Sequence, residues 1–282
     1  ACSRLSPHLA WGTLSLREVV RASRRGGGPR AFEERLHWHC HFIQKLESEP
    51  ELEFRDAHPA YAGLRQTDPQ RLAAWSLGRT GWPFVDACMR ALIAGGWINF
   101  RMRAMLMAVA SQHLWIHWRD SGLVLARLFV DYEPGIHWNQ CQMQAGTTGI
   151  NIVRLYNPIK QGLDHDPEAV FIRRWLPELD RVPAVHRHTP WTMSLAEQQS
   201  AGCLLGVDYP LPLLDHLQAA REARERVWAV RRGDGFRRTA DAIQARHGSR
   251  RSGMKTPRSG VSRRRPSARS VGYPQQLTLD LG

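Results

Sequence analysis

The sequence predicts an all-α protein, and three observations support this fold class. Apolar residues recur at helical spacing in several segments of the chain. Residues that start and stop helices, such as a capping serine, a first-turn proline or a terminal glycine, flank those segments. No segment alternates apolar and polar residues over the length of a strand, and no internal repeat is present. We therefore expect a helical globular part over residues 1–232 and a basic, largely disordered tail over residues 233–282.

The helices expected from these patterns have recognisable boundaries. Ser15 caps the first one, and Glu18 completes a capping box three residues later. A later helix has Pro83 in its first turn and stops at Gly95. Residues 98–118 are apolar on most faces, which is typical of a helix buried in the core. The expected helices span residues 15–23, 33–46, 69–75, 82–93, 98–118, 123–130, 167–175 and 213–231.

The composition argues against several classes of protein. No run of about 18 apolar residues occurs, so no membrane-spanning helix is expected. The five cysteines are scattered and form no CxxC pair, which argues against a disulfide framework, a zinc site or an iron–sulfur cluster. Reduced thiols of this kind favour a cytoplasmic protein. The chain opens at Ala1 without a Met, which indicates a fragment or a processed N-terminus.

The whole chain carries a net charge of +13, and most of this positive charge lies at its C-terminal end. From Arg231 onward there are 13 Lys and Arg residues and three Asp residues, so this segment carries +10 and the preceding 230 residues only +3. Residues 246–274 are also rich in Arg, Ser, Gly and Pro, which is typical of disorder. Such a tail suits binding to nucleic-acid phosphates, and a solubilising disordered end is the alternative.

Residues 131–158 form a dense polar segment in an otherwise Trp-rich, apolar chain. Asp131 and Glu133 are two residues apart, His137 follows, and a Gly/Thr-rich loop comes next. Polar groups of this density are costly to bury unless they find hydrogen-bond partners, so the segment predicts a ligand site. Near the N-terminus, small hydroxyl side chains in residues 2–6 precede a helix, an arrangement that suits phosphate binding as well as ordinary capping.

Several motifs resemble the flavin-binding core of the cryptochrome/photolyase family. The run Cys2-Ser-Arg-Leu-Ser-Pro7 is similar to the family's Thr-Ser-x-Leu-Ser-Pro motif, which holds the FAD pyrophosphate. The run Gly78-Arg-Thr-Gly-Trp-Pro-Phe-Val-Asp-Ala-Cys-Met-Arg90 is similar to the family's Gly-x-Thr-Gly-x-Pro-x-Val-Asp-Ala-x-Met-Arg signature. The resemblance covers residues 2–230 without the α/β antenna domain that normally precedes it, so we expect the flavin-binding catalytic half alone. Further matches lie in residues 97–103, 154–158, 171–179 and 209–216.

The resemblance implies that FAD is the cofactor and that it lies in a bowl of helices. Arg103 and Asp131 match the family's salt bridge beside the isoalloxazine ring, where a guanidinium stabilises the anionic reduced flavin and the carboxylate keeps it paired. Glu133 matches a carboxylate that faces a polar edge of the cofactor, and His137 matches the residue that faces flavin N5. His39 stands where the family has an Arg that contacts the phosphates. An ordinary buried ion pair and a surface histidine are the alternatives for the salt bridge and for His137. The implied cofactor contacts are Cys2, Ser3, Arg4, Leu5, Ser6, Arg35, Trp38, His39, Arg103, Asp131, Tyr132, Glu133 and His137.

The substrate side departs further from the family pattern. Trp38 matches the aromatic residue that stacks on a flipped pyrimidine dimer, and a core aromatic is the alternative. Arg35 stands where the repair pattern has a Glu, and Phe100 stands where it has an Asn. Met143 replaces a second stacking Trp, and Ala104 replaces a Met. The residues expected to face the substrate are Trp38, Phe100 and Met143.

The family's relay of three tryptophans for photoreduction is only partly kept. Trp118 is retained in register, whereas Cys141 occupies the flavin-proximal position and Arg65 the surface position. Other tryptophans, Trp138 among them, offer a different path, although most tryptophans serve packing. The expected electron-transfer residues are Trp97, Trp115 and Trp118.

Together these features predict light-driven repair of cyclobutane pyrimidine dimers in DNA by a monomeric bacterial flavoprotein of the cytoplasm. In that mechanism excited reduced FAD donates an electron to the dimer, the ring splits and the electron returns. Two rivals stay open: a cryptochrome-like blue-light photoreceptor that keeps FAD without repair, and a non-catalytic DNA-binding remnant. The run Gln276-Leu-Thr-Leu-Asp-Leu281 is similar to peptides that dock on bacterial sliding clamps, so a clamp is a second expected partner besides DNA.

Overall fold

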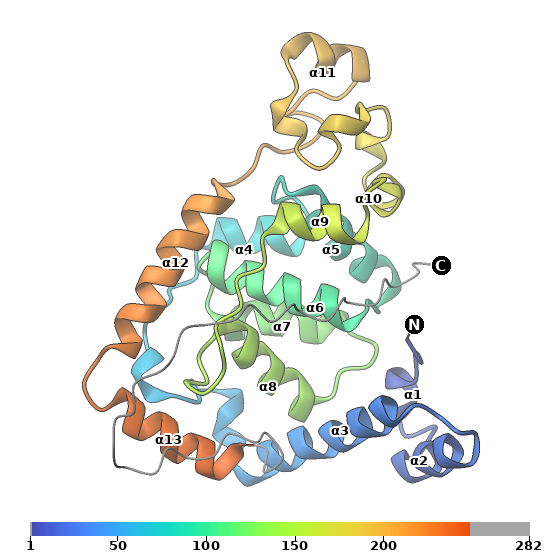
Figure 1. Cartoon of the computed structure of the whole chain (residues 1–282). Coiled ribbons are helices and arrows are strands. Elements are labelled where there is room, and N and C mark those ends of the chain that lie inside the picture. The colour runs from blue at the N-terminus through green and yellow to red at the C-terminus, as the bar shows by residue number, and fades with distance from the viewer. Residues whose placement is uncertain (1, 249–282) are drawn as a thin grey trace, which may run out of the picture.

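The computed structural model describes residues 2–248, and over that range it is built from helices without strands (Figure 1). This architecture confirms the all-α prediction. Among residues 2–248, none of the helices combines the length and the apolar composition that a membrane span requires. The α-helices are α1 (Ser6–Ala10), α2 (Leu16–Arg25), α3 (Arg30–Ser48), α4 (Pro69–Ser76), α5 (Pro83–Gly95), α6 (Phe100–Ala108), α7 (Trp118–Leu128), α8 (Pro134–Ala145), α9 (Pro158–His165), α10 (Val170–Trp175), α11 (Leu195–Ala201), α12 (His216–Arg231) and α13 (Phe236–His247). The short elements are the π-helix η3 (Val109–His113) and the 3-10 turns η1 (Pro50–Glu53), η2 (Pro59–Tyr61), η4 (Pro177–Leu179), η5 (Ala184–His186) and η6 (Pro190–Thr192).

Helices α5 to α8 form the centre of the molecule, with α3 and α12 packed around them (Figure 1). Helix α5 is buried along most of its length and ends at Gly95, and the next residue, Gly96, caps it with a left-handed φ of 67°. The carbonyl of Gly96 accepts a hydrogen bond from Val130 N (3.0 Å), so the end of α5 fixes the chain just before Asp131. Four indole side chains in the core are almost fully buried: Trp75, Trp82, Trp118 and Trp138.

The prediction of a single helix over residues 98–118 is wrong for the second half of that range. Helix α6 continues as the π-helix η3, and the next helix begins only at Trp118. The guanidinium of Arg65 donates from Nε to Ser111 O (2.8 Å), so this carbonyl binds a side chain in addition to, or in place of, a backbone N–H of the helix. Trp115 takes the left-handed conformation with a φ of 57°, in which a right-handed helix cannot continue.

Helix α8 lies in the polar segment, where the sequence patterns predicted no helix. Glu133 caps it by accepting a hydrogen bond from Gly135 N (3.2 Å), and Gly146 ends it with a left-handed φ of 76°. One face of α8 is buried although it carries amide side chains. Gln142, for example, is 2% exposed and donates from Nε2 to Leu52 O (2.8 Å). Buried amides with specific backbone partners leave no apolar stripe, so a periodicity search misses the helix.

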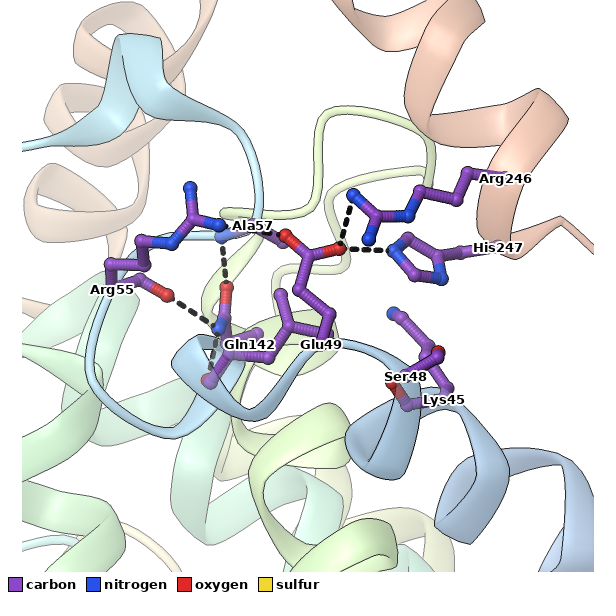
Figure 2. Close-up of polar contacts among 9 residues, drawn as sticks. Lys45, Ser48, Glu49, Arg55, Ala57, Gln142, Arg246 and His247 are labelled. Carbon is purple, nitrogen blue, oxygen red and sulfur yellow. Dashed lines mark hydrogen bonds and ion pairs between the residues drawn. The ribbon is translucent and has the colours of Figure 1, made fainter.

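Helix α13 lies within the segment expected as a tail, so the folded part of the chain extends further than predicted. At its start, the ring of Phe236 stacks on that of His58 with the centroids 4.0 Å apart. At its end, Arg246 and His247 pair with the carboxylate of Glu49 at 3.2 and 2.5 Å, and Glu49 is only 9% exposed (Figure 2). His58 and Glu49 are both distant from α13 in the sequence, so the basic composition of this segment did not reveal these contacts.

Residues 249–282 lie outside the described part of the chain. The disorder expected for most of residues 246–274 and the clamp-binding peptide expected at Gln276 to Leu281 therefore stay predictions. The last described residue, Gly248, directly follows His247, which pairs with Glu49.

Replacing Glu49 with Gln should release the C-terminal end of α13. The amide loses the charge that pairs with Arg55 (2.9 Å), Arg246 and His247 together. Breaking a largely buried set of ion pairs costs about 3 kcal/mol, so hydrogen exchange in α13 should become about 100-fold faster while α5 stays protected. The matched control is Glu47→Gln, an exposed position on α3, which should leave the exchange unchanged. Equal protection of α13 in both variants would contradict this role of Glu49.

Candidate functional site

A bidentate ion pair forms the centre of the candidate site. The guanidinium of Arg103, in the first turns of α6, donates from Nη1 and Nη2 to the two carboxylate oxygens of Asp131, both at 2.9 Å. Its Nε donates to Ile98 O (2.7 Å), and its Cζ lies 4.2 Å from the centre of the Phe129 ring. The Asp131 side chain is 2% exposed and that of Arg103 is 22% exposed. The guanidinium is therefore held in one orientation while part of it stays open to a ligand.

Trp97, expected as an electron carrier, joins the N-terminal motif to this ion pair. Its Nε1 donates to Ser6 Oγ (3.2 Å), and the guanidiniums of Arg4 and Arg103 lie 5.3 and 5.8 Å from its ring centre. Arg4 takes a left-handed φ of 54°, which is uncommon for a non-glycine residue and is often found at ligand sites. The structure thus brings the start of α1 to the ion pair. The remaining residues of the motif are exposed or partly buried: Cys2, Ser3 and Leu5.

His137 is buried in the wall formed by α7 and α8. It is 7% exposed, so the alternative of a surface histidine is wrong. Its Nε2 lies 2.9 Å from Gly122 O and 3.5 Å from Cys141 Sγ, and its ring centre is 5.2 Å from that of Tyr132. Burial lowers the pKa of His137 to about 4, so the ring is neutral near pH 7. A neutral imidazole that donates from Nε2 to a carbonyl keeps Nδ1 as an acceptor.

Helix α3 closes the site against α8. The contact is so close that a Cβ added at Gly135 would lie 2.6 Å from Ile43 Cα. His39, on α3, has a buried Nδ1 that finds no hydrogen-bond partner within residues 2–248. Burial lowers the pKa of His39, and the charge of Glu133 acts in the opposite direction, which places that carboxylate near the ring. Arg35, one turn earlier on α3, is exposed.

These residues fit a bound FAD by the chemistry of their donors and acceptors. The guanidiniums of Arg4 and Arg103 suit the negative charges of a diphosphate and a reduced ring. The unpaired nitrogen of His39 lacks a partner that a polar atom of the cofactor can supply, and His137 offers an acceptor to a ring N–H. The described range contains no group of three or more His, Cys, Asp and Glu residues that could hold a metal ion.

The residues expected to face the substrate lie on three different helices. Trp38, on α3, is 39% exposed, and its ring contacts those of His41 and Phe42 at 5.3 and 5.6 Å. This exposure argues against the alternative of a core aromatic. Phe100, at the start of α6, is 58% exposed, whereas Met143, on α8, is partly buried. Trp38 and Phe100 therefore each present an exposed aromatic ring.

Among the described residues, Trp118 packs against Trp138, the tryptophan of the alternative path, and not against the expected Trp97 or Trp115. Its ring centre lies 6.0 Å from that of Trp138, which in turn lies 4.8 Å from the ring of His137. Trp115 instead lies 4.6 Å from the guanidinium of Arg65. The expected surface position of Arg65 is also wrong, because this residue is 5% exposed and is held by backbone carbonyls. In the described structure the ring contacts therefore run from His137 through Trp138 to Trp118.

Two residues of the site escaped the sequence analysis. Phe129 lies against the guanidinium of Arg103, and Gly122 supplies the carbonyl that binds His137. A Cβ at Gly122 would lie 2.8 Å from the Trp138 ring, so only glycine fits there without a shift of the indole. No pattern in the sequence marked Phe129 as a residue of the site.

Comparison with known proteins defines the class to which this site belongs. Residues 32–229 match the FAD binding domain of DNA photolyase. The chain is 36% identical over 229 residues to a deoxyribodipyrimidine photo-lyase of Streptomyces griseus, which covers 80% of this chain and 49% of that protein. It is 33% identical over 228 residues to a protein of the same name from Alkalihalophilus pseudofirmus, with 78% and 48% covered. A cryptochrome DASH of Gloeobacter violaceus is 36% identical over 166 residues, with 56% and 33% covered.

Solved structures agree with these relatives. A bacterial class III photolyase from Agrobacterium tumefaciens superposes with a TM-score of 0.75 at 30% identity, covering 83% of this chain and 50% of that one. The chain therefore belongs to the photolyase/cryptochrome family, and FAD is the cofactor of the matched domain. The chain spans about half the length of the curated relatives it matches. Because the relatives include photolyases and cryptochromes, membership defines the cofactor and leaves the activity to a proposal.

Proposed function

We propose that this protein repairs cyclobutane pyrimidine dimers in DNA by light-driven electron transfer. The observation that carries the proposal is the exposed indole of Trp38, which directly precedes His39 on the helix that lines the flavin site. A surface aromatic beside the cofactor provides the stacking that a flipped base requires. The relatives from S. griseus and A. pseudofirmus, both named deoxyribodipyrimidine photo-lyase, support it.

Five residues of the site have a proposed role toward FAD. When bound, reduced FAD supplies the electron that light sends to the dimer. The positive charge of Arg103 favours the anionic reduced ring, and Asp131 keeps the guanidinium in one orientation. The neutral His137 accepts a hydrogen bond from the ring through Nδ1. Arg4 and His39 contact the phosphates, which satisfies the unpaired nitrogen of His39.

Substrate binding is proposed for the exposed surface beside Trp38. The indole stacks on a base of the flipped dimer, and the exposed ring of Phe100 adds apolar surface that excludes water. Arg35 is exposed on the same helix as Trp38 and supplies positive charge toward the DNA backbone. The protein therefore positions the lesion, and the cofactor provides the chemistry.

A photoreceptor of the cryptochrome type is the second candidate function. Met143 and Arg35 stand where the repair pattern has a Trp and a Glu, so neither can make the usual dimer contact. The cryptochrome DASH of G. violaceus also matches part of the chain. In that case the protein would hold FAD, and the exposed indole of Trp38 would have no preference for damaged DNA.

Trp38→Ala should remove lesion recognition and leave the flavin in place. Stacking of a base on an aromatic side chain contributes about 1–3 kcal/mol, so affinity for a dimer-containing single strand should fall about 10- to 100-fold. The dissociation constants for damaged and undamaged strands, measured in the dark, check this. The matched control is Trp228→Ala, whose indole is 49% exposed on α12 and should not affect binding. Equal affinity of the FAD-loaded wild type for both strands would contradict repair and favour the photoreceptor.

A further inference from the structure

A cleft of about 430 Å³ lies beside α12, apart from the flavin site. Its walls come from the start of α4 and the segment before it, from the end of η3 and the two residues after it, and from residues 214–226 at and within α12. Arg103 and His113 are ten residues apart along the α6–η3 run, a separation of about 15 Å along a helix axis. The volume of the cleft lies in the ordinary range for small-molecule sites. None of the roles proposed for flavin or dimer binding uses it.

The backbone at this cleft departs from regular geometry in two places. Element η3 is a π-helix of five residues, and π-helical turns often mark functional sites. Trp115 follows shortly after and takes a left-handed φ of 57°, which is a strained conformation for an aromatic residue. Such strain persists only where the surroundings hold it, and here the buried guanidinium of Arg65 lies 4.6 Å from the indole.

His113 adds an unsatisfied polar group to the wall of the cleft. The residue is 3% exposed, and its Nδ1 has no hydrogen-bond partner in the described part of the chain. Burial lowers the pKa of His113 to about 4, and His216 acts in the same direction, so the ring is neutral near pH 7. A neutral imidazole offers a ligand one donor and one acceptor.

The charged side chains of the cleft are paired with one another. Arg71 Nε lies 3.4 Å from Asp68 Oδ2, and Arg226 Nη2 lies 3.3 Å from Glu222 Oε2. The third carboxylate, that of Asp215, caps α12 by accepting a hydrogen bond from a first-turn backbone N–H (2.6 Å). A charged ligand would have to compete with these internal partners. The cleft therefore suits a ligand that is polar and carries no net charge.

Flat groups and amides complete the lining. The guanidinium of Arg226, which lines the cleft, lies 4.9 Å from the centre of the Trp115 ring, and that indole is partly exposed. Indole rings and guanidinium planes are the groups on which nucleobases stack in proteins. Gln66 and Gln218 line the same cleft, and side-chain amides can pair with the edge of a base.

We propose that this cleft binds a single nucleobase, stacked on the surface formed by Trp115 and Arg226 and hydrogen-bonded by His113 and Gln66. The base can belong to a free nucleoside or to single-stranded nucleic acid, since both offer the same planar, uncharged, polar ring. This site is separate from the surface around Trp38, so the inference stands whether or not the protein repairs dimers.

Adenosine and a short oligo(dA) strand, added in the dark to FAD-loaded protein, test the site by equilibrium dialysis. Trp115→Gly removes the indole at a position whose φ suits glycine, and it should weaken adenosine binding about tenfold or more. Gln66→Ala, which truncates an exposed side chain, should weaken binding about fivefold. The control Trp228→Ala removes an exposed indole on α12 outside the cleft and should change nothing.

Adenosine binding that both cleft variants weaken would support the proposal. A strand that binds more tightly than adenosine, with the same dependence on Trp115 and Gln66, would identify nucleic acid as the source of the base, and equal affinities would identify a free nucleoside. The proposal is overturned if the wild type binds neither probe, or if Trp115→Gly and Gln66→Ala leave the binding unchanged.

Discussion

Asp131→Ala should yield a purified protein that has lost its flavin. The substitution takes both 2.9 Å partners from the guanidinium of Arg103, which is only 22% exposed. Leaving a mostly buried charge unpaired costs about 3 kcal/mol or more, so Arg103 should turn away and the site should lose its shape. The ratio of flavin to protein absorbance after purification measures the effect.

The matched control breaks an ion pair of similar burial outside the site. Arg90 and Glu178 lie 2.8 Å apart, with side chains 26% and 19% exposed. Glu178→Ala should lower the stability of the fold and still retain one FAD per chain. A wild-type flavin content in Asp131→Ala would contradict the assignment of the ion pair to the cofactor site.

The largest loss of stability is expected for Asp86→Ala. Asp86 is fully buried, and its carboxylate accepts two hydrogen bonds from Thr80, through N (2.8 Å) and Oγ1 (2.7 Å). Gly81 N (3.0 Å) and the Tyr209 hydroxyl (2.6 Å) donate two more. Each buried donor left unpaired costs about 1–3 kcal/mol, so the free energy of unfolding should fall by about 4 kcal/mol or more.

Urea denaturation of Asp86→Ala checks this expectation. The control Asp164→Ala breaks an exposed pair with Lys160 (2.7 Å) and should change the free energy of unfolding by about 0.5 kcal/mol or less. Losses of similar size in the two variants would refute the importance of the Asp86 network. The network also shows that Asp86 ties the motif over residues 78–90 to Tyr209 and so maintains the fold.

The same carboxyl group should make stability depend on pH. Burial raises the pKa of Asp86 to about 6, above the value of about 3.9 expected in the unfolded chain. The folded state therefore binds the Asp86 proton more tightly than the unfolded chain does. The stabilisation that this proton gives to the fold is fully present below about pH 4 and is lost as the pH rises through about 6. The stability of the wild type relative to Asp86→Asn should fall over that range by about 2–3 kcal/mol. A difference that does not change between pH 4 and 7 would contradict the raised pKa.

Local signals in the sequence predicted the helices that carry their own boundary chemistry. The capping box of α2 is confirmed, with Ser15 Oγ accepting from Glu18 N (3.2 Å) and Glu18 accepting from Ser15 N (2.8 Å). Helix α5 likewise begins at Pro83 and ends at glycine as expected. These features depend on residues within one turn of each other, so the sequence displays them directly.

Features that depend on distant contacts were not predictable in this way. The π-helix after α6 and the break before α7 involve Arg65, which comes from a loop more than 40 residues earlier. Helix α8 buries amides that bond to the η1 segment, and α13 is held by Glu49, the residue that follows α3. In the site, the pair of Arg103 and Asp131 was expected from the family resemblance, whereas the aromatic contact of Phe129 with Arg103 had no pattern to reveal it.

Blue-light repair of a dimer-containing oligonucleotide tests the proposed function most directly. The protein should be loaded with FAD and chemically reduced beforehand, so that the assay does not depend on photoreduction of the flavin through Trp138 and Trp118. We expect light-dependent restoration of the pyrimidines by the wild type and its loss in Trp38→Ala at unchanged flavin content. Reduced, flavin-loaded protein that splits no dimer under blue light would contradict repair and assign the site to a photoreceptor.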